Sequence, residues 1–485
     1  MNRWWRPPRP VRALGAVLAA GALVVGAACT QPTESGHSPH PLTVGTFGRV
    51  TTTDPAAATD TGSTIYVLNV FQRLLTTEAG TGVLKPDAAS DCWFIDEVTY
   101  SCGLRKDMTF INGNPVTASD VKFSIERAMD LDVPGSSARQ LDNVEDMIVT
   151  EDDPYRIDFK LAQHDRAFGY ALASPAASIV DEDTYPDDEL WPQGQQPVSS
   201  GPFYAEVATL DELQLNRYSG YRGRHGGRLP AVTLKTYSTP EALDRAVATG
   251  TIDVLWRVPV QRVPGDGDFQ RQVLAGATVQ RLLWNPESPR REDAAVRDWV
   301  RDATTPLRTL ASPVPQGAGF AADTFAVGGD KPTAPDGLSG EITLGYDTRL
   351  PGQADLAARV RDAVRPELGV RLVGDDPDAD VRLTMGQAWT NTEMAWLQPY
   401  VEFPLPGREA EVRELELAFR ASEKLPEAER AARELQEAVA RDATVVPLIQ
   451  SDEEFWIAPG VALPEDDPGW LGPTYQLAAW GFGRE

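Results

Sequence analysis

The 485-residue sequence is poor in the residues that enzymes use for acid–base, thiol and metal chemistry. It has four histidines and three cysteines, and it contains no G-x-S-x-G, H-E-x-x-H, Walker-type phosphate loop or paired C-x-x-C motif. His37 and His40 lie in a polar segment near the N-terminus, which leaves only His164 and His225 for a role as base or metal ligand. We therefore expect no catalytic residues, no bound metal and no cofactor.

Positive charge is also scarce. The sequence has 45 Lys and Arg against 71 Asp and Glu, which gives a formal net charge of −26. Residues 1–28 contain four arginines and no acidic residue, so the remainder carries a net charge of −30. Proteins that bind nucleic acid or anionic membrane surfaces need clustered Lys and Arg. This charge balance argues against a nucleic-acid partner.

Long apolar runs are absent after the N-terminal segment, so no later stretch is expected to span a bilayer. Within residues 1–28, four arginines precede the apolar, small-residue stretch Ala13–Ala28, a pattern that predicts a signal peptide. The end of this segment resembles a bacterial lipobox with Cys29 as the lipid-modified residue, although Gly26 stands where Leu, Val or Ile is usual. The alternative is a plain signal peptide with an incidental cysteine. Residues 29–41 are rich in Pro, Ser and Thr and predict a flexible tether.

The remaining cysteines, Cys92 and Cys102, flank a predicted β-hairpin. A three-residue loop at Asp96–Val98 places the two cysteines directly opposite each other, within reach of a disulfide. Export to an oxidising compartment favours this disulfide. Metal binding is the alternative, but two thiols lack further Cys or His ligands nearby.

Hydrophobic periodicity predicts further elements along the chain. We expect a strand in Pro41–Val50 and a helix over Ile65–Leu75, where apolar residues recur at steps of three and four. Two strands are predicted at Met147–Val149 and Arg156–Leu161, and an amphipathic helix at Ala431–Arg441.

The segment Leu104–Asp130 has the most specific local pattern. Its apolar residues at even spacing lead into the turn Asn112–Pro115, and Thr117 then predicts a helix N-cap. Asp120, three residues later, is placed to accept from the N–H of the cap residue. One face of the helix is apolar, with residues at helical spacing: Val121, Ile125, Ala128 and Met129. The pattern by itself indicates a scaffold helix.

The same segment resembles the signature of the family 5 extracellular solute-binding proteins, the peptide-binding receptors of ABC importers. The matching residues are Leu104, Arg105, Phe110, Asn112, Gly113, Pro115, Thr117, Ala118, Asp120, Val121, Phe123, Ser124 and Arg127. Similarity to the family continues in order over most of residues 42–460, at Thr51–Ala56, Pro197–Tyr204, Leu215–Tyr221, Pro240–Val254 and Asp442–Leu448.

The resemblance implies an α/β fold of the periplasmic-binding-protein type II kind, three-lobed, with a ligand cleft between lobes I/II and III. Lobe I would comprise residues 42–63, 199–282 and 450–485, lobe II residues 64–198, and lobe III residues 283–449. The implied function is the extracytoplasmic solute-binding component of an ABC importer, which captures peptides or a related small solute and delivers it to the membrane permease. We expect a monomer on the outer face of the cytoplasmic membrane, attached through lipid on Cys29.

By the same resemblance, ligand contacts are expected in two segments. The first is the turn Arg49, Val50, Thr51 and Thr52, and the second comprises Gly386, Gln387, Trp389, Thr390, Asn391 and Glu393. Trp396, Trp470 and Trp480 are further candidates, because an indole offers wide apolar contact and one donor, with core or hinge packing as the alternative. If Arg49 faces the cleft, we expect a preference for ligands that carry a carboxylate.

The sequence departs from the family pattern at Val296–Leu310 and in the lobe III segment. In peptide-binding members, an Asp after Gly-Trp meets the α-amino group of the ligand, whereas no Asp follows Trp389 here. Glu393 is the candidate substitute, and recognition of a free peptide N-terminus stays open. Two alternatives to transport therefore remain: an envelope lipoprotein that uses the same fold as a scaffold or regulator, and an exported hydrolase.

Overall fold

Caps, turns and alternating apolar residues of the sequence produce the elements of the computed structural model. It describes residues 41–46, 49–77, 83–150, 152–224, 229–257, 269–274, 279–310, 320–348, 350, 352–385, 394–422, 424–450, 453–459, 461–462 and 481–482. All of these lie in one compact unit, His37–Glu485.

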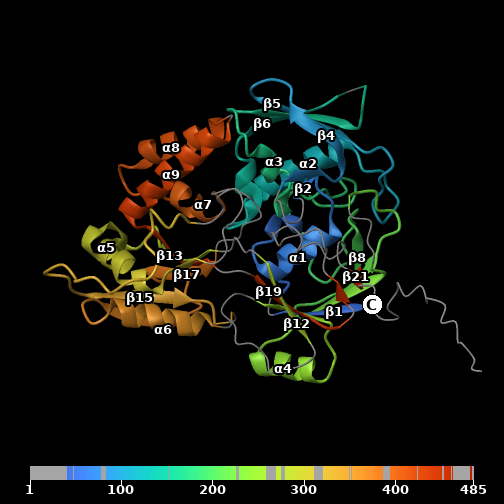
Figure 1. Cartoon of the computed structure of the whole chain (residues 1–485). Helices are drawn as coiled ribbons and strands as arrows, with labels where there is room; N and C mark the ends of the chain where they lie inside the picture. Colours follow the sequence, from blue (N-terminus) through green and yellow to red (C-terminus); the bar gives the residue numbers. More distant parts are fainter. Residues whose placement is uncertain are drawn as a thin grey trace, which may run out of the picture. The chain divides into compact units, whose positions relative to one another are not determined.

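A seven-stranded mixed sheet is assembled from three separate parts of the chain (Figure 1). Its strands, in spatial order, are β12 (Gln270–Leu274), β19 (Glu453–Ile457), β11 (Val254–Arg257), β1 (Leu42–Thr46), β10 (Ala231–Thr236), β9 (Glu212–Arg217) and β8 (Phe203–Ala208). β1 pairs in parallel with both β10 and β11. The helix α1 (Thr61–Val70) packs into the core of one face, and α4 (Pro240–Ala248) packs into a smaller apolar cluster with Leu255 of β11.

A four-stranded antiparallel sheet comes from one continuous stretch of chain. Its strands, in spatial order, are β4 (Ala89–Phe94), β5 (Thr99–Leu104), β7 (Arg156–Leu161) and β6 (Val144–Val149). Alternate residues of these strands form a core with α2 (Ala118–Leu131) and α3 (Phe168–Ala171). A small ladder of β2 (Leu75–Thr77) and β3 (Leu84–Pro86) precedes β4.

A six-stranded mixed sheet lies in the C-terminal half of the chain. Its strands, in spatial order, are β14 (Thr309–Leu310), β18 (Val445–Gln450), β13 (Val279–Trp284), β17 (Val381–Met385), β15 (Glu341–Tyr346) and β16 (Gly369–Gly374). One apolar cluster joins the sheet to α5 (Ala294–Ala303) and α6 (Gln353–Val364). A second cluster joins it to α7 (Met394–Glu402), α8 (Glu409–Ala421) and α9 (Leu425–Asp442) (Figure 1). The sheet is therefore covered on both faces, which explains why β13 and β18 are apolar along most of their length.

Short elements complete the described part of the chain. They are the 3-10 helices η1 (Pro55–Ala57), η2 (Ser137–Leu141), η3 (Pro175–Ala177), η4 (Pro289–Glu292) and η5 (Thr305–Leu307), and the strand pair β20 (Val461–Ala462) and β21 (Gly481–Phe482).

Several local predictions are confirmed. Thr117 is the N-cap of α2, and its N–H donates to the carboxylate of Asp120 at 2.8 Å. Cys92 lies opposite Cys102 in the β4–β5 hairpin and forms a disulfide with it. The predicted strands at 147–149 and 156–161 are β6 and β7, which pair antiparallel.

The helix predicted over Ile65–Leu75 is displaced in the structure. It begins at Thr61, because Asp60 caps it by accepting from the N–H of Ser63 at 2.8 Å. It ends at Val70, whose carbonyl accepts from the N–H of Gly201 at 2.9 Å, and Leu75 belongs to a strand instead. The apolar spacing of 65–75 therefore combines a helix with a buried extended segment. At the ends, the first strand is shorter than predicted (Leu42–Thr46), and the helix predicted at 431–441 begins earlier, at Leu425.

Candidate functional site

The turn after β1 is fixed to the start of α1. The backbone N–H groups of Thr51 and Thr52 both donate to Oγ of Ser63, at 3.0 and 3.1 Å. The hydroxyl of Thr51 donates to the carboxylate of Asp60, the N-cap of α1. These hydrogen bonds hold the backbone of Thr51 and Thr52, both predicted ligand-binding residues, in a fixed position. The hydroxyl of Thr51 is already hydrogen-bonded to Asp60.

The other two predicted residues of this turn differ in exposure. Val50 is 2% exposed and belongs to the apolar core under the seven-stranded sheet. Arg49 donates through Nε to Asp211 at 3.0 Å, and both side chains are about half exposed, at 42% and 58%. Exposed ion pairs contribute little to stability. A ligand carboxylate at Arg49 would therefore compete with Asp211 at low cost.

Except for Trp396, the remaining predicted ligand-binding residues lie outside the described part of the chain. They are Gly386, Gln387, Trp389, Thr390, Asn391, Glu393, Trp470 and Trp480, and the predicted lipidation residue Cys29 is outside it too. In the sequence, segment 386–393 directly follows β17 (Val381–Met385).

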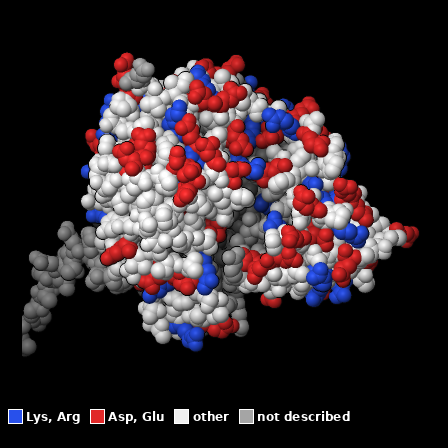
Figure 2. All heavy atoms as spheres, turned by 180° about the vertical axis from the view of Figure 1, so that it is seen from behind, with Lys and Arg blue, Asp and Glu red and all other residues white. Residues whose placement is uncertain are grey.

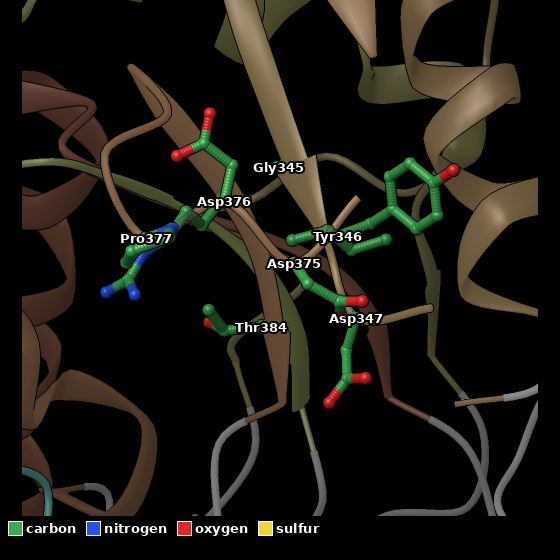
Figure 3. A pocket seen from close by; sticks show the side chains of 9 residues that line it. Gly345, Tyr346, Asp347, Asp375, Asp376, Pro377 and Thr384 are labelled. Carbon is green, nitrogen blue, oxygen red and sulfur yellow. The ribbon is translucent and has the colours of Figure 1, made fainter. Parts of the chain in front are cut away.

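An open pocket of about 560 Å³ lies at the carboxyl ends of the parallel strands β15 and β16 and of β17 (Figure 3). Its lining residues are Gly345, Tyr346, Asp347, Asp375, Asp376, Pro377, Arg382, Leu383 and Thr384. In Figure 3 the ring of Tyr346 points away from the Asp376–Pro377 loop. Ligands of open α/β sheets bind at the carboxyl ends of the strands. The position and size of this pocket therefore suit a contact surface for a small ligand.

The loop that forms one wall of this pocket is held by local contacts. Asp375 has a positive φ of 53°, and its carboxylate accepts from the N–H of Thr348 at 3.0 Å. Three carboxylates and one guanidinium, that of Arg382, line the pocket, so its charge is negative on balance.

Asp380 anchors the start of β17 behind the pocket. Its carboxylate accepts from the hydroxyl of Ser288 at 2.6 Å and from the N–H and hydroxyl of Thr343 at 2.8 and 2.9 Å. Burial acts to raise the pKa of Asp380, but these donors outweigh it and hold the pKa below its ordinary value. The carboxylate therefore ties β17 to β15 and to the segment before η4.

Buried polar groups that the sequence analysis did not select collect at the other end of β17. Arg281 and Thr384 are directly paired across β13 and β17, and Gln280 is paired with Met385, the last described residue before segment 386–393. Gln280 is 0% exposed and Arg281 7% exposed. Within the described ranges, the side-chain amide of Gln280, Nε of Arg281 and Oγ1 of Thr384 have no hydrogen-bonding partner. Arg281 and Thr384 lie on the face of the sheet that packs against α7, whereas Gln280 lies on the opposite face. Buried polar atoms in native proteins nearly always have a partner, so Arg281 and Thr384 favour a polar occupant on their face of the sheet, close to the start of segment 386–393.

Arg281 carries a charge in this buried place. One of its terminal nitrogens donates to the backbone carbonyl of Trp396 at 2.6 Å. Burial lowers the pKa of Arg281 to about 10, and the carboxylate of Glu402 opposes the shift. Trp396 itself is 1% exposed and packs against Phe325, so it is a core residue. The sequence does contain a sign of these buried polar residues, because Gln280 and Arg281 interrupt the otherwise apolar strand VQRLLW.

The signature segment around α2 has a structural role. The guanidinium of Arg127 donates to both carboxylate oxygens of Asp54, at 3.1 and 2.6 Å, and both side chains are almost fully buried. Asp54 also accepts from the N–H groups of Ala56 and Trp191, at 2.9 and 2.6 Å. This pair joins the turn after β1 to α2, as the scaffold interpretation of the signature requires.

Acidic side chains are spread over the face shown in Figure 2, in agreement with the net charge of −26. Among the helices within the described ranges, none combines the length and the apolar character needed to cross a membrane.

Comparisons with known proteins show which family and which relatives the chain resembles. Residues 83–298 match the family described as "Bacterial extracellular solute-binding proteins, family 5 Middle". The chain is 27% identical over 331 residues to the "Probable ABC transporter periplasmic-binding protein SapA" of Escherichia coli K12, an alignment that covers 62% of this chain and 60% of that protein. This relative is thus matched over less than two thirds of its length.

Two solved structures have the same fold over nearly the whole chain. The periplasmic binding protein AgaA of A. tumefaciens R10, in complex with agropinic acid, is 17% identical with a TM-score of 0.78, and the alignment covers 92% of this chain and 99% of AgaA. DppA of Helicobacter pylori, in complex with the peptide STSA, is 17% identical with a TM-score of 0.75, and the alignment covers 92% and 98%. These likenesses confirm the predicted type II binding-protein fold. Residues 83–298 are thus similar to the family 5 bacterial extracellular solute-binding proteins, and the chain has the fold of these two periplasmic binding proteins.

Proposed function

We propose that this protein captures a small solute outside the cytoplasm and delivers it to the permease of an ABC importer. The observation that carries the proposal is the match of residues 83–298 to family 5, on a fold that aligns with solute-bound receptors over 92% of the chain. The name of SapA assigns that relative to an ABC transporter, which supports the same role here. We propose no catalytic activity, because the family is one of binding proteins.

The three large sheets support three lobes. We assign the seven-stranded sheet to lobe I, the four-stranded sheet to lobe II and the six-stranded sheet to lobe III. β13 begins at Val279 and pairs with β17 and β18, which argues for a boundary between lobes I and III before Val279 rather than after residue 282. The return to lobe I falls between β18, which ends at Gln450, and β19, which begins at Glu453.

We propose that the lobe III ligand contacts lie at the end of β17, in segment 386–393 and beside Arg281 and Thr384. A peptide or another solute with amide and carboxylate groups would supply the partners that these buried donors and acceptors need. Arg49, Thr51 and Thr52 remain the proposed contacts on the lobe I side, with Arg49 exchanging Asp211 for a ligand carboxylate, whereas the buried Val50 is no longer proposed.

We also propose a lipid anchor on Cys29 that keeps a monomeric receptor at the outer face of the cytoplasmic membrane. The N-terminal arginines, the apolar stretch and the small residues before Cys29 support this placement.

The function is tested by native mass spectrometry of the purified protein, followed by denaturation and identification of the released small molecule. We expect a single class of solute with polar ends, bound in a one-to-one ratio. A protein that stays empty after incubation with peptide, sugar and metal-chelate libraries would contradict the proposal.

A matched pair of threonine variants locates the site. Thr384→Val removes a hydroxyl without a partner among the described residues, so we expect unchanged or slightly higher stability and about tenfold weaker solute binding. Thr304→Val is the control, because the Thr304 hydroxyl donates to the carbonyl of Val300 at 2.8 Å within a buried turn of lobe III. The control should lose about 1 kcal/mol of stability and keep its affinity.

A further inference from the structure

Two parts of the chain that belong to different sheets meet through a nearly buried ion pair. Asp165 lies between β7 of the four-stranded sheet and α3, whereas Arg420 lies in the last turn of α8, which covers the six-stranded sheet. A terminal nitrogen of Arg420 donates to the carboxylate of Asp165 at 2.5 Å. The Asp165 side chain is 2% exposed and that of Arg420 17% exposed. The two residues are 255 positions apart, so the contact is purely tertiary.

Backbone and side-chain contacts surround this pair. The N–H of Arg166 donates to the carbonyl of Arg420 at 3.0 Å, so main chain joins main chain at the same point. Glu416, one turn earlier on α8, accepts from Nε of Arg420 at 2.9 Å and orients the guanidinium. A second ion pair, Arg139 of η2 with Glu402 of α7 at 3.9 Å, links the same two parts. We call the group Asp165, Arg166, Glu416 and Arg420 the clasp.

The carboxylates of the clasp stabilise the charged form of its arginine. Burial acts to lower the pKa of Arg420, but the carboxylates of Asp165 and Glu416 raise it above its ordinary value. Asp165 also accepts from the N–H of Ala167 at 2.9 Å, which holds its carboxylate in place on the lobe II side. Each half of the clasp is thus preorganised by its own element before the two halves meet.

Such a pair suits a contact that must form and break. Bringing two ions out of water costs about as much as their attraction returns, so an intact buried pair adds little net stability. Removing one partner while the other stays buried is costly, at roughly 3–5 kcal/mol in other proteins. If the two parts separate instead, both charges return to water and no charge is left unpaired. The clasp is therefore specific in geometry but easy to open.

We propose that the clasp is a releasable contact between lobes II and III that fixes the geometry in which the cleft closes. Its link to solute binding rests on the proposed function, in which closure of lobe III on lobes I and II retains the solute. A ligand shifts such an equilibrium through contacts made only in the closed form, whereas the clasp selects the geometry of that form without touching the ligand.

Hydrogen–deuterium exchange of the full-length protein, with no solute added, tests the clasp. In Arg420→Gln we expect the amide of Arg166 and the last turn of α8 to exchange at least about tenfold faster, because local opening becomes more frequent. The amides of β7, which bond within the four-stranded sheet, should keep their protection. Asp165→Asn should give the same pattern, and the double variant should add nothing further.

Arg433→Gln is the matched control. It removes an exposed ion pair with Asp323, in which the side chains are 55% and 61% exposed, and both residues belong to lobe III. This variant should leave the exchange of Arg166 unchanged. Unchanged exchange of 162–168 in both clasp variants would overturn the proposal, and so would a general loss of protection that includes β7.

The exchange test of the clasp and the solute-binding test of the proposed function can give independent results. Exchange is measured without a solute, so the clasp can fail while solute binding succeeds. A protein that binds no solute can still show the clasp pattern. If both hold, Arg420→Gln should release a bound solute faster in the native mass spectrometry experiment, while Arg433→Gln should not.

Discussion

At the scale of single residues, the ion pair Arg127–Asp54 gives a structural role to one residue of the signature segment and to one residue of the turn after β1. Arg127 closes the signature segment, and Asp54 lies in the turn after β1 that the sequence linked to the same family. Asp54 is 0% exposed, and its four hydrogen bonds leave it fully partnered. Both residues therefore position elements and have no contact with a ligand to make.

We expect Arg127→Leu to destabilise the protein by about 3–5 kcal/mol, because the Asp54 carboxylate stays buried without its cation. Urea denaturation followed by circular dichroism measures the change. Arg371→Ala is the control, since it removes an exposed pair with Glu341 at 3.7 Å and should cost less than about 1 kcal/mol. A loss below 1 kcal/mol in Arg127→Leu would refute this account.

Asp380 gives a pH-dependent prediction at the same scale. Hydroxyl and N–H donors hold its pKa below the ordinary value in the folded protein. The carboxylate thus contributes stability at neutral pH, which is lost as the pH falls below about 3.9 and through the lower pKa of the folded state.

In Asp380→Asn we expect stability at pH 7 to fall by about 1–2 kcal/mol, because one charge-assisted acceptor is lost. The difference from the wild type should shrink toward pH 3, as the wild-type carboxyl becomes protonated. Urea midpoints measured from pH 7 to pH 3 provide the check. A difference that stays constant over this range would contradict the assigned charge.

At the scale of elements, the β4–β5 hairpin shows how a local pattern can determine a tertiary bond. The loop of three residues sets the register, and the register places Cys92 opposite Cys102. β4 is an edge strand of its sheet, so the disulfide fixes an element that pairs on one side only.

Replacing both cysteines, Cys92→Ser with Cys102→Ser, should lower stability by about 1–3 kcal/mol through the greater freedom of the unfolded chain. Reducing agent should lower the Tm of the wild type and leave the Tm of the double variant unchanged. Equal sensitivity of both proteins to the reductant would show that the disulfide does not form.

At the scale of the whole molecule, the excess of acidic residues acts on the folded state. A net charge of −26 repels itself more strongly in the compact fold than in the extended unfolded chain. Salt shortens the range of this repulsion, from a Debye length of about 30 Å at 0.01 M to about 8 Å at 0.15 M.

We therefore expect the Tm to rise by a few degrees when sodium chloride increases from about 0.01 to 0.15 M. Differential scanning calorimetry measures the shift, and potassium chloride at equal ionic strength serves as the control. A falling Tm would mean that attractive ion pairs, such as those of the clasp, outweigh the general repulsion.

The sequence by itself indicated the resemblance to family 5, and it determined the fold class, the capped helix α2 and the hairpin of Cys92. These depend on contacts between residues close in sequence, or on a motif whose order is specific. It misplaced the helix at Ile65–Leu75, since apolar spacing alone does not distinguish a helix from the buried extended segment that follows Val70.

Only the tertiary structure decided what the buried polar residues do. Sequence gave no means to see that Arg127 meets Asp54, that Arg281 and Thr384 pair beside the start of segment 386–393, or that Asp165 meets Arg420. The partners in these contacts lie 73 to 255 positions apart. Whether a charge is exposed, paired or buried depends on which strands and helices are brought together, and no local pattern carries that information.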